Sequence, residues 1–257
     1  MVGWLRAALA GLGCASALVG LPASAGTAEA NPYAAYDWSV FLPYINAPEG
    51  DADITASPRL RISFGGASHE AILDTGSTGI VVSASDIPGV DTLPAIPGQL
   101  AYSSSGRIML GKWVTTPVTV EGKDGTRFTT RAMPVLALDR IDCRPKARNC
   151  EPEDAPKGVA MLGIGFGREH DGQEQSTPDK NPFLAEAAAG GRQRHGYVVT
   201  RTGVRIGLTA NDVGADFAFV KLQPNAKYAA DWTAAPVCIT LDESLPPPAA
   251  PRWSIPE

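Results

Sequence analysis

The chain has 257 residues, and its 22 Lys and Arg against 27 Asp and Glu give a formal net charge of -5. Hydrophobic residues make up 44% of the sequence, which is enough for a folded core and excludes a disordered or acidic solvating chain, while the charge excludes a basic nucleic-acid-binding protein as the default. The 27 Gly and 22 Pro predict many turns, which suit short β-strands better than a helical bundle.

Residues 1–25 have the pattern of a signal peptide. Arg6 supplies the positive charge, residues 7–20 form an apolar stretch, and Ala23-Ser24-Ala25 offers small residues at the cleavage site. An uncleaved membrane anchor is the weaker interpretation because glycines and a proline interrupt the stretch, and no later stretch is long and apolar enough to cross a bilayer. We therefore expect an exported protein, periplasmic or secreted, with no membrane contact after signal cleavage.

The rest of the chain has a β-rich pattern. A lead-in segment over 26–56 has no sustained period, and beyond it Leu60, Ile62 and Phe64 alternate with polar residues as in a half-buried strand. Further β-like stretches lie at 71–73, 80–82, 102–110, 113–120, 128–138, 197–200, 204–208 and 217–222. One short helix is expected over 182–189 with Asn181 as its N-cap. The Pro-rich end over 245–257 favours a polyproline-like tail.

Three cysteines follow the expected signal peptide. Cys143 and Cys150 bracket a short polar loop, which predicts a local disulfide in an oxidising compartment. Cys238 is then left over, either as a buried free thiol or with a partner outside this chain. The histidines are scattered without the spacing of metal ligands, so we expect no metal and no other cofactor.

The most informative stretch runs over 71–82, where an apolar segment enters Asp74-Thr75-Gly76-Ser77 and a second apolar segment leaves it. A carboxylate on a tight glycine turn between buried strands is held rigidly beside backbone N–H groups and a hydroxyl, which suits a catalytic acid or base. A plain turn is the competing interpretation, since these residue types are common in turns. The apolar flanks on both sides, together with Ser77, favour the functional interpretation.

At these residues the sequence resembles the pepsin-like aspartic peptidases. Residues 60–66 followed by 69–74 look like the first hairpin that leads to the catalytic loop. Residues 100–108 are similar to the flap that closes over substrate, with Tyr102 as the flap tyrosine and a serine in place of the usual glycine after it. Residues 159–166, Val-Ala-Met-Leu-Gly-Ile-Gly-Phe, resemble the apolar strand with glycines that passes behind the catalytic loop.

This resemblance implies roles for the residues of the motif. Asp74 would be one catalytic aspartate, and Ser77 would donate a hydrogen bond to its outer oxygen. Thr75 and Gly76 would build the interlocked turn at the junction of two lobes. In the implied mechanism two carboxylates share one proton, so that one stays an acid while the other activates water, with no covalent intermediate and no metal. The flap residues that would cover a polypeptide substrate are Tyr102, Ser103 and Ser104.

The implied fold is all-β, of the acid-protease type, with one complete lobe over 57–167 and a partial second lobe over 168–244. A two-lobed enzyme carries a second Asp-Thr-Gly or Asp-Ser-Gly, but the sequence beginning at Asp74 is the only one in this chain. Asp216 and Asp242 both lack the glycine turn. The chain therefore supplies only one aspartate to the pair that an aspartic endopeptidase needs.

Three interpretations follow from the single motif. In the first, the chain is a shortened two-lobed peptidase that lacks the part bearing the second aspartate. In the second, two copies each supply Asp74 across a two-fold axis, as in the retroviral-type peptidases, because a symmetric interface brings the same residue together from both subunits. In the third, the domain is an inactive exported module that keeps the cleft and holds a peptide or polysaccharide strand in it.

Overall fold

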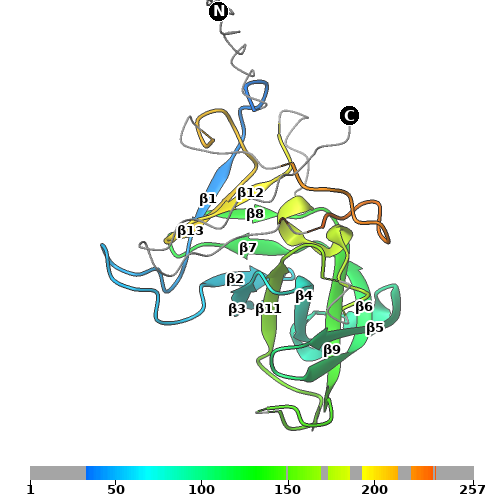
Figure 1. The fold of residues 1–257 in the computed structure, drawn as a ribbon. Helices are drawn as coiled ribbons and strands as arrows, with labels where there is room; N and C mark the ends of the chain where they lie inside the picture. The colour runs from blue at the N-terminus through cyan, green and yellow to red at the C-terminus, as the bar shows by residue number, and fades with distance from the viewer. Residues whose placement is uncertain are drawn as a thin grey trace, which may run out of the picture. The chain divides into compact units, whose positions relative to one another are not determined.

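The computed structural model describes residues 33–148, 150–168, 173–185, 193–213, 221–233 and 235. Within these residues the fold is all-β, with thirteen strands in two sheets and four short 3₁₀ turns (Figure 1). This confirms the all-β part of the expected fold class. Among the described residues, no helix has the length and apolar character needed to span a membrane. The expected signal peptide, Cys238 and the Pro-rich tail lie outside the described residues.

The larger sheet has ten strands and contains the motif. Its strand order is β5-β6-β9-β4-β11-β3-β2-β7-β8, with β10 paired to β9 (Figure 1). The bounds are β2 (Arg59–Ser63), β3 (Ser68–Asp74), β4 (Thr78–Ser83), β5 (Ala95–Tyr102), β6 (Arg107–Thr116), β7 (Thr119–Glu121), β8 (Arg127–Thr129), β9 (Met133–Cys143), β10 (Glu153–Asp154) and β11 (Ala160–Ile164).

At the centre of this sheet, β11 lies between the two strands that flank the motif. It runs parallel to β3 and antiparallel to β4, and β4 in turn runs parallel to β9. All six residues of β4 are buried, as expected for a strand whose core is the β-branched run Ile80-Val81-Val82. The turn between β3 and β4 is therefore anchored on both sides by strands of the protein core.

The hairpin of β5 and β6 forms one edge region of the sheet. It pairs from Ala95 with Val114 to Tyr102 with Arg107, and β6 pairs on its other side with β9. The β6–β9 register shifts at Gly111, where a Cβ atom would lie 1.9 Å from the carbonyl oxygen of Ala137. A residue without a side chain is required there because the two backbones approach so closely.

The smaller sheet has three antiparallel strands in the order β1-β13-β12. Leu42 of β1 and Ile206 of β13 have no exposed surface, and they belong to the same apolar cluster as Leu60 and Ile62 of β2. The two sheets therefore share one core. The bounds of these strands are β1 (Val40–Pro43), β12 (Tyr197–Val199) and β13 (Gly203–Ile206).

Two local expectations differ from the structure. The lead-in segment contains β1, whose short apolar run was not recognised as a strand. The helix expected over 182–189 is wrong in its described part, where only a 3₁₀ turn over Pro182–Leu184 forms. The predicted cap is present, since Asn181 Oδ1 accepts a hydrogen bond from Phe183 N at 3.0 Å. The carbonyl of Ala185, the residue after this turn, accepts a hydrogen bond from Arg131 N at 2.7 Å.

Candidate functional site

The carboxylate of Asp74 is held by its own loop. Asp74 ends β3, and its side chain is partly buried. Gly76 N donates a hydrogen bond to Asp74 Oδ1 at 2.8 Å, and Ser77 Oγ donates one to Asp74 Oδ2 at 2.6 Å. A Cβ atom on Gly76 would lie 3.1 Å from Oδ1, so a side chain at this position would crowd the carboxylate. Thr75 is exposed at the tip of the turn, whereas Ser77 is fully buried.

The glycines of β11 and of the segment after it allow close packing behind this loop. A Cβ atom on Gly163 would lie 2.6 Å from Gly79 O and 2.7 Å from Ser77 Oγ, and one on Gly165 would lie 2.5 Å from Thr75 O. Gly165 N donates to Ser77 O at 2.7 Å. The strand that the sequence placed behind the loop is therefore in direct contact with it, and no larger residue fits at either glycine.

Tyr102 lies beside Asp74 and Ser77. It ends β5 and is 9% exposed, and its hydroxyl is buried with no hydrogen-bond partner among the described residues. Burial raises the pKa of Tyr102 well above its usual range. The Ser77 side chain lowers this pKa by a smaller amount, and the negative charge of Asp74 raises it. The hydroxyl therefore stays protonated over the whole pH range in which an acidic carboxyl site would work.

The turn of the β5–β6 hairpin is anchored rather than free. The predicted disulfide between Cys143 and Cys150 is present, with an S–S distance of 2.05 Å, and this confirms the pairing. Arg144 N, inside the disulfide loop, donates to Gly106 O at 2.8 Å. The other predicted residues of the turn, Ser103 and Ser104, are exposed to solvent. The disulfide loop therefore holds the end of the hairpin that carries Tyr102.

Two contacts to the Asp74 loop were missed by sequence reasoning. Ser176 Oγ lies 2.8 Å from both the backbone N and O of Thr78, and Gln173 Nε2 donates to Gly76 O at 3.2 Å. Both residues belong to a polar stretch, Gln-Glu-Gln-Ser-Thr over 173–177, that has the composition of an ordinary surface loop. Yet Gln173 and Ser176 are only 2% and 1% exposed.

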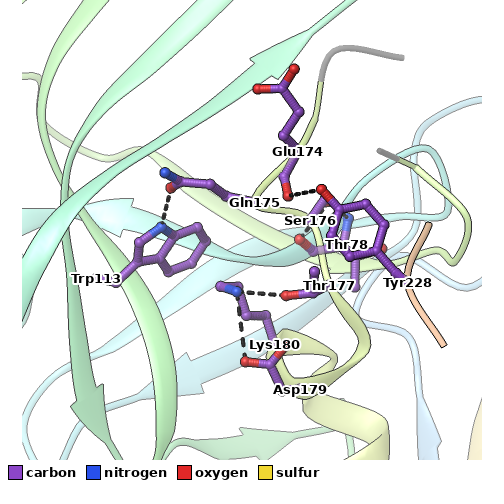
Figure 2. A network of polar contacts seen from close by, with 9 residues as sticks. All are labelled: Thr78, Trp113, Glu174, Gln175, Ser176, Thr177, Asp179, Lys180 and Tyr228. Carbon is purple, nitrogen blue, oxygen red and sulfur yellow. Dashed lines mark hydrogen bonds and ion pairs between the residues drawn. The ribbon is translucent and has the colours of Figure 1, made fainter. Parts of the chain in front are cut away.

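Gln175 of the same segment lines a pocket of about 450 Å³, together with Asp179 and Lys180 and with residues of the β5–β6 hairpin such as Ile96 and Trp113. Gln175 Oε1 accepts hydrogen bonds from Trp113 Nε1 at 2.5 Å and from Gln99 N at 3.0 Å. Lys180 Nζ lies 5.1 Å from the centre of the Trp113 ring and donates to Thr177 Oγ1 at 2.6 Å. Figure 2 shows these contacts on one side of the segment and the Ser176–Thr78 contact on the other.

One buried aspartate was not considered in the sequence. Asp231 is 2% exposed, and its carboxylate accepts hydrogen bonds from Gly167 N at 2.9 Å and from Trp232 N at 2.8 Å. It therefore ties the segment after β11 to the last described residues. The two aspartates that the sequence analysis did consider, Asp216 and Asp242, lie outside the described residues.

Among the described residues, no group of three or more His, Cys, Asp or Glu side chains is close enough to hold a metal ion. A scan against protein-family models finds no matching family, and a search of curated proteins finds no match. The site is therefore interpreted from its own geometry. It brings together Asp74, Ser77 and Tyr102, as the resemblance implied, and adds Gln173 and Ser176 behind the loop.

Proposed function

We propose that this chain carries half of the active site of an aspartic endopeptidase with a pepsin-like fold, and that Asp74 is its catalytic carboxylate. The observation that carries the proposal is the double hydrogen bonding of this carboxylate, by Gly76 N at 2.8 Å and Ser77 Oγ at 2.6 Å. A carboxylate held in one orientation by fixed donors needs little reorganisation when it exchanges a proton with water. That property suits general acid–base hydrolysis of a peptide bond.

Two further features support the pepsin-like assignment. The first is that β11 is inserted between β3 and β4 directly behind the loop. The second is the β5–β6 hairpin, whose Tyr102 is near enough to Asp74 for the carboxylate charge to act on it. Each is a long-range arrangement that a plain surface turn does not require.

The proposed reaction needs a second carboxyl group beside Asp74. One carboxylate takes a proton from water as the oxygen bonds to the peptide carbonyl carbon, and a carboxylic acid then gives a proton to the amide nitrogen as the C–N bond breaks. Like charges a few ångströms apart cannot both ionise, so the pair shares one proton at acidic pH. Since the chain contains one Asp-Thr-Gly, we propose that a second copy, or polypeptide outside this chain, supplies the partner carboxyl.

We also propose that the protein is exported. The amino-terminal pattern supports export, and the disulfide between Cys143 and Cys150 fits an oxidising compartment, where such bonds persist. A polypeptide is the proposed substrate.

Digestion of an unfolded protein tests the catalytic role of Asp74. Reduced and alkylated casein is incubated near pH 4 with the wild-type chain, with Asp74→Asn, and with Asp91→Asn, which changes a carboxyl group that is 89% exposed at its side chain. We expect Asp74→Asn to lower the cleavage rate by a factor of about a thousand, since general acid–base groups contribute factors of about 10² to 10⁴. Equal cleavage by wild type and Asp74→Asn, or cleavage by neither, contradicts the proposal.

The source of the second carboxyl is tested by mixing. If two copies share the site, the specific activity rises with protein concentration, and an excess of Asp74→Asn suppresses the wild-type activity by forming mixed dimers. Activity that is proportional to concentration and unaffected by the variant would place the second carboxyl elsewhere.

A second candidate function is a peptide-binding module without activity, and the single Asp-Thr-Gly in the chain favours it. This candidate predicts saturable binding of a peptide that is the same in the wild-type chain and in Asp74→Asn, measured by calorimetry, with no cleavage by either.

A further inference from the structure

The backbone of the Asp74 loop has polar groups that its own strands do not satisfy. These groups are the carbonyl of Gly76 and the backbone N–H and carbonyl of Thr78. Each finds a partner in the segment over 173–176: Gly76 O accepts from Gln173 Nε2 at 3.2 Å, Thr78 N donates to Ser176 Oγ at 2.8 Å, and Thr78 O lies 2.8 Å from the same hydroxyl. Buried backbone groups must be paired, so these side chains complete the hydrogen bonding of the loop backbone.

The two side chains also lie against each other. Ser176 Oγ is 3.1 Å from Gln173 Oε1, and its single hydroxyl hydrogen is shared between this oxygen and Thr78 O, which is closer at 2.8 Å. Both are almost fully buried, and hydrogen bonds between buried groups are stronger and better defined than those at the surface. The pair therefore forms a buried polar support for the loop, in addition to the contacts that β11 makes.

The neighbouring glutamine of the same segment faces elsewhere. Gln175 Oε1 is committed to Trp113 Nε1 and Gln99 N in the hairpin, and Figure 2 shows its side chain directed away from Thr78. Residues of one short segment therefore contact different parts of the protein. Gln173 and Ser176 contact the Asp74 loop, whereas Gln175 contacts the β5–β6 hairpin.

We propose that Gln173 and Ser176 are positioning residues for Asp74: they fix the backbone at Gly76 and Thr78, and thereby hold Gly76 N and Ser77 Oγ in place to donate to the carboxylate. The proposal rests on the function proposed above for Asp74, but its geometric part can be tested separately. When the support is removed, the backbone at Gly76 and Thr78 is held less firmly, and the hydrogen bond from Gly76 N to Asp74 Oδ1 opens more often.

The test is hydrogen exchange of the Gly76 amide, followed by NMR, because this amide donates to Asp74 Oδ1 and neither substitution removes its acceptor. Gln173→Ala and Ser176→Ala are each compared with the wild type, and Gln175→Ala is the matched control from the same segment. We expect the Gly76 amide to exchange about tenfold faster in the first two variants, because local opening of the loop becomes easier, and to exchange at the wild-type rate in Gln175→Ala.

Circular dichroism checks that each variant is folded, and the two variants give independent tests because they remove different bonds. Unchanged exchange of the Gly76 amide in both variants overturns the inference, as does an equal increase in Gln175→Ala, which would show a general loosening of the segment. If the wild-type chain also cleaves casein, we expect kcat to fall about tenfold with KM unchanged, in proportion to the lost stabilisation. A wild-type chain that does not cleave would reject the proposed function and leave the NMR result to decide the positioning role.

Discussion

At Gly163, two backbones and one side chain meet with no room for a methyl group. A Cβ atom there would lie 2.6 Å from Gly79 O and 2.7 Å from Ser77 Oγ, the same hydroxyl that donates to Asp74. A larger residue at this position in β11 would therefore displace a group that hydrogen-bonds the Asp74 carboxylate.

We expect Gly163→Ala to lower the free energy of unfolding by about 3 kcal/mol, because inserting atoms into a fully packed site costs about 1–3 kcal/mol or more. Urea denaturation gives the value. Gly66→Ala is the control, since its Cβ atom meets only a side-chain atom of Pro88 at 3.2 Å, and there the change should stay within about 0.5 kcal/mol. Equal losses in the two variants would contradict the packing argument.

Whether a residue of the site could be predicted from the sequence depends on how far apart in the chain its contacts are. Asp74 and Ser77 could be found because they are three positions apart and form their contact within one turn. Gln173 and Ser176 could not, because their contacts to the loop span 97 and 98 positions and nothing near them in the sequence suggests burial. Asp231 likewise reaches Gly167 across 64 positions. Long-range polar contacts leave no periodic pattern from which they can be predicted.

At the scale of elements, the disulfide loop and the β5–β6 hairpin act as one unit. β6 pairs with β9 as far as Arg107 with Cys143, and the disulfide then closes a loop whose Arg144 N holds Gly106 O. A Cβ atom on Gly106 would lie 2.6 Å from Ala147 Cβ, so the turn also packs tightly on this loop. The position of Tyr102 thus depends on a covalent bond outside its own hairpin.

We expect the double substitution Cys143→Ser and Cys150→Ser to release the hairpin turn. Removing so short a loop constraint costs about 2–3 kcal/mol in the chain-entropy model. Hydrogen exchange followed by mass spectrometry should show at least tenfold faster exchange in 103–106, with little change in the turn over 122–126 at the other edge of the sheet. A uniform increase across the protein would instead indicate global destabilisation.

The strands could be predicted where the alternation of apolar and polar residues and the position of turn residues indicate the same hairpin. The hairpins around Gly65 and over 103–106 formed as expected, because apolar alternation and a Ser/Gly turn point to the same structure. β1 was missed because its four residues are too few to show a period, and its partner β13 lies far along the chain. In the described part of the expected helix, Pro182–Leu184 form a 3₁₀ turn, and Ala185 O accepts a tertiary hydrogen bond from Arg131 N, which local sequence signals cannot predict.

At the scale of the whole molecule, two buried tyrosines make the fold sensitive to alkali. Tyr44 is 1% exposed and Tyr102 is 9% exposed, and neither hydroxyl has a hydrogen-bond partner among the described residues. Burial raises the pKa of Tyr44 to about 12 and raises the pKa of Tyr102 as well. Both residues are therefore neutral in the folded state at pH values where the unfolded chain already loses its protons.

The sign of the effect follows from linkage. The unfolded tyrosines ionise near pH 10, so the stability from keeping these groups neutral is complete below that pH and is lost progressively as the pH rises toward 12. We expect the urea midpoint of the wild type to fall between pH 9 and pH 11, and to fall less in Tyr44→Phe and Tyr102→Phe. Tyr228→Phe, which changes a half-buried tyrosine, is the control, and an equal response in all three variants would contradict the assignment.

The indole of Trp113 is an optical reporter placed between the hairpin and the segment that supports the Asp74 loop. It is 4% exposed, it donates to Gln175 Oε1, and the Lys180 ammonium lies over its ring. Detachment of the segment would remove the hydrogen bond and the nearby charge together and would admit water, so the emission of this tryptophan would shift to longer wavelength. Events at the proposed catalytic loop could then be followed by fluorescence without any label.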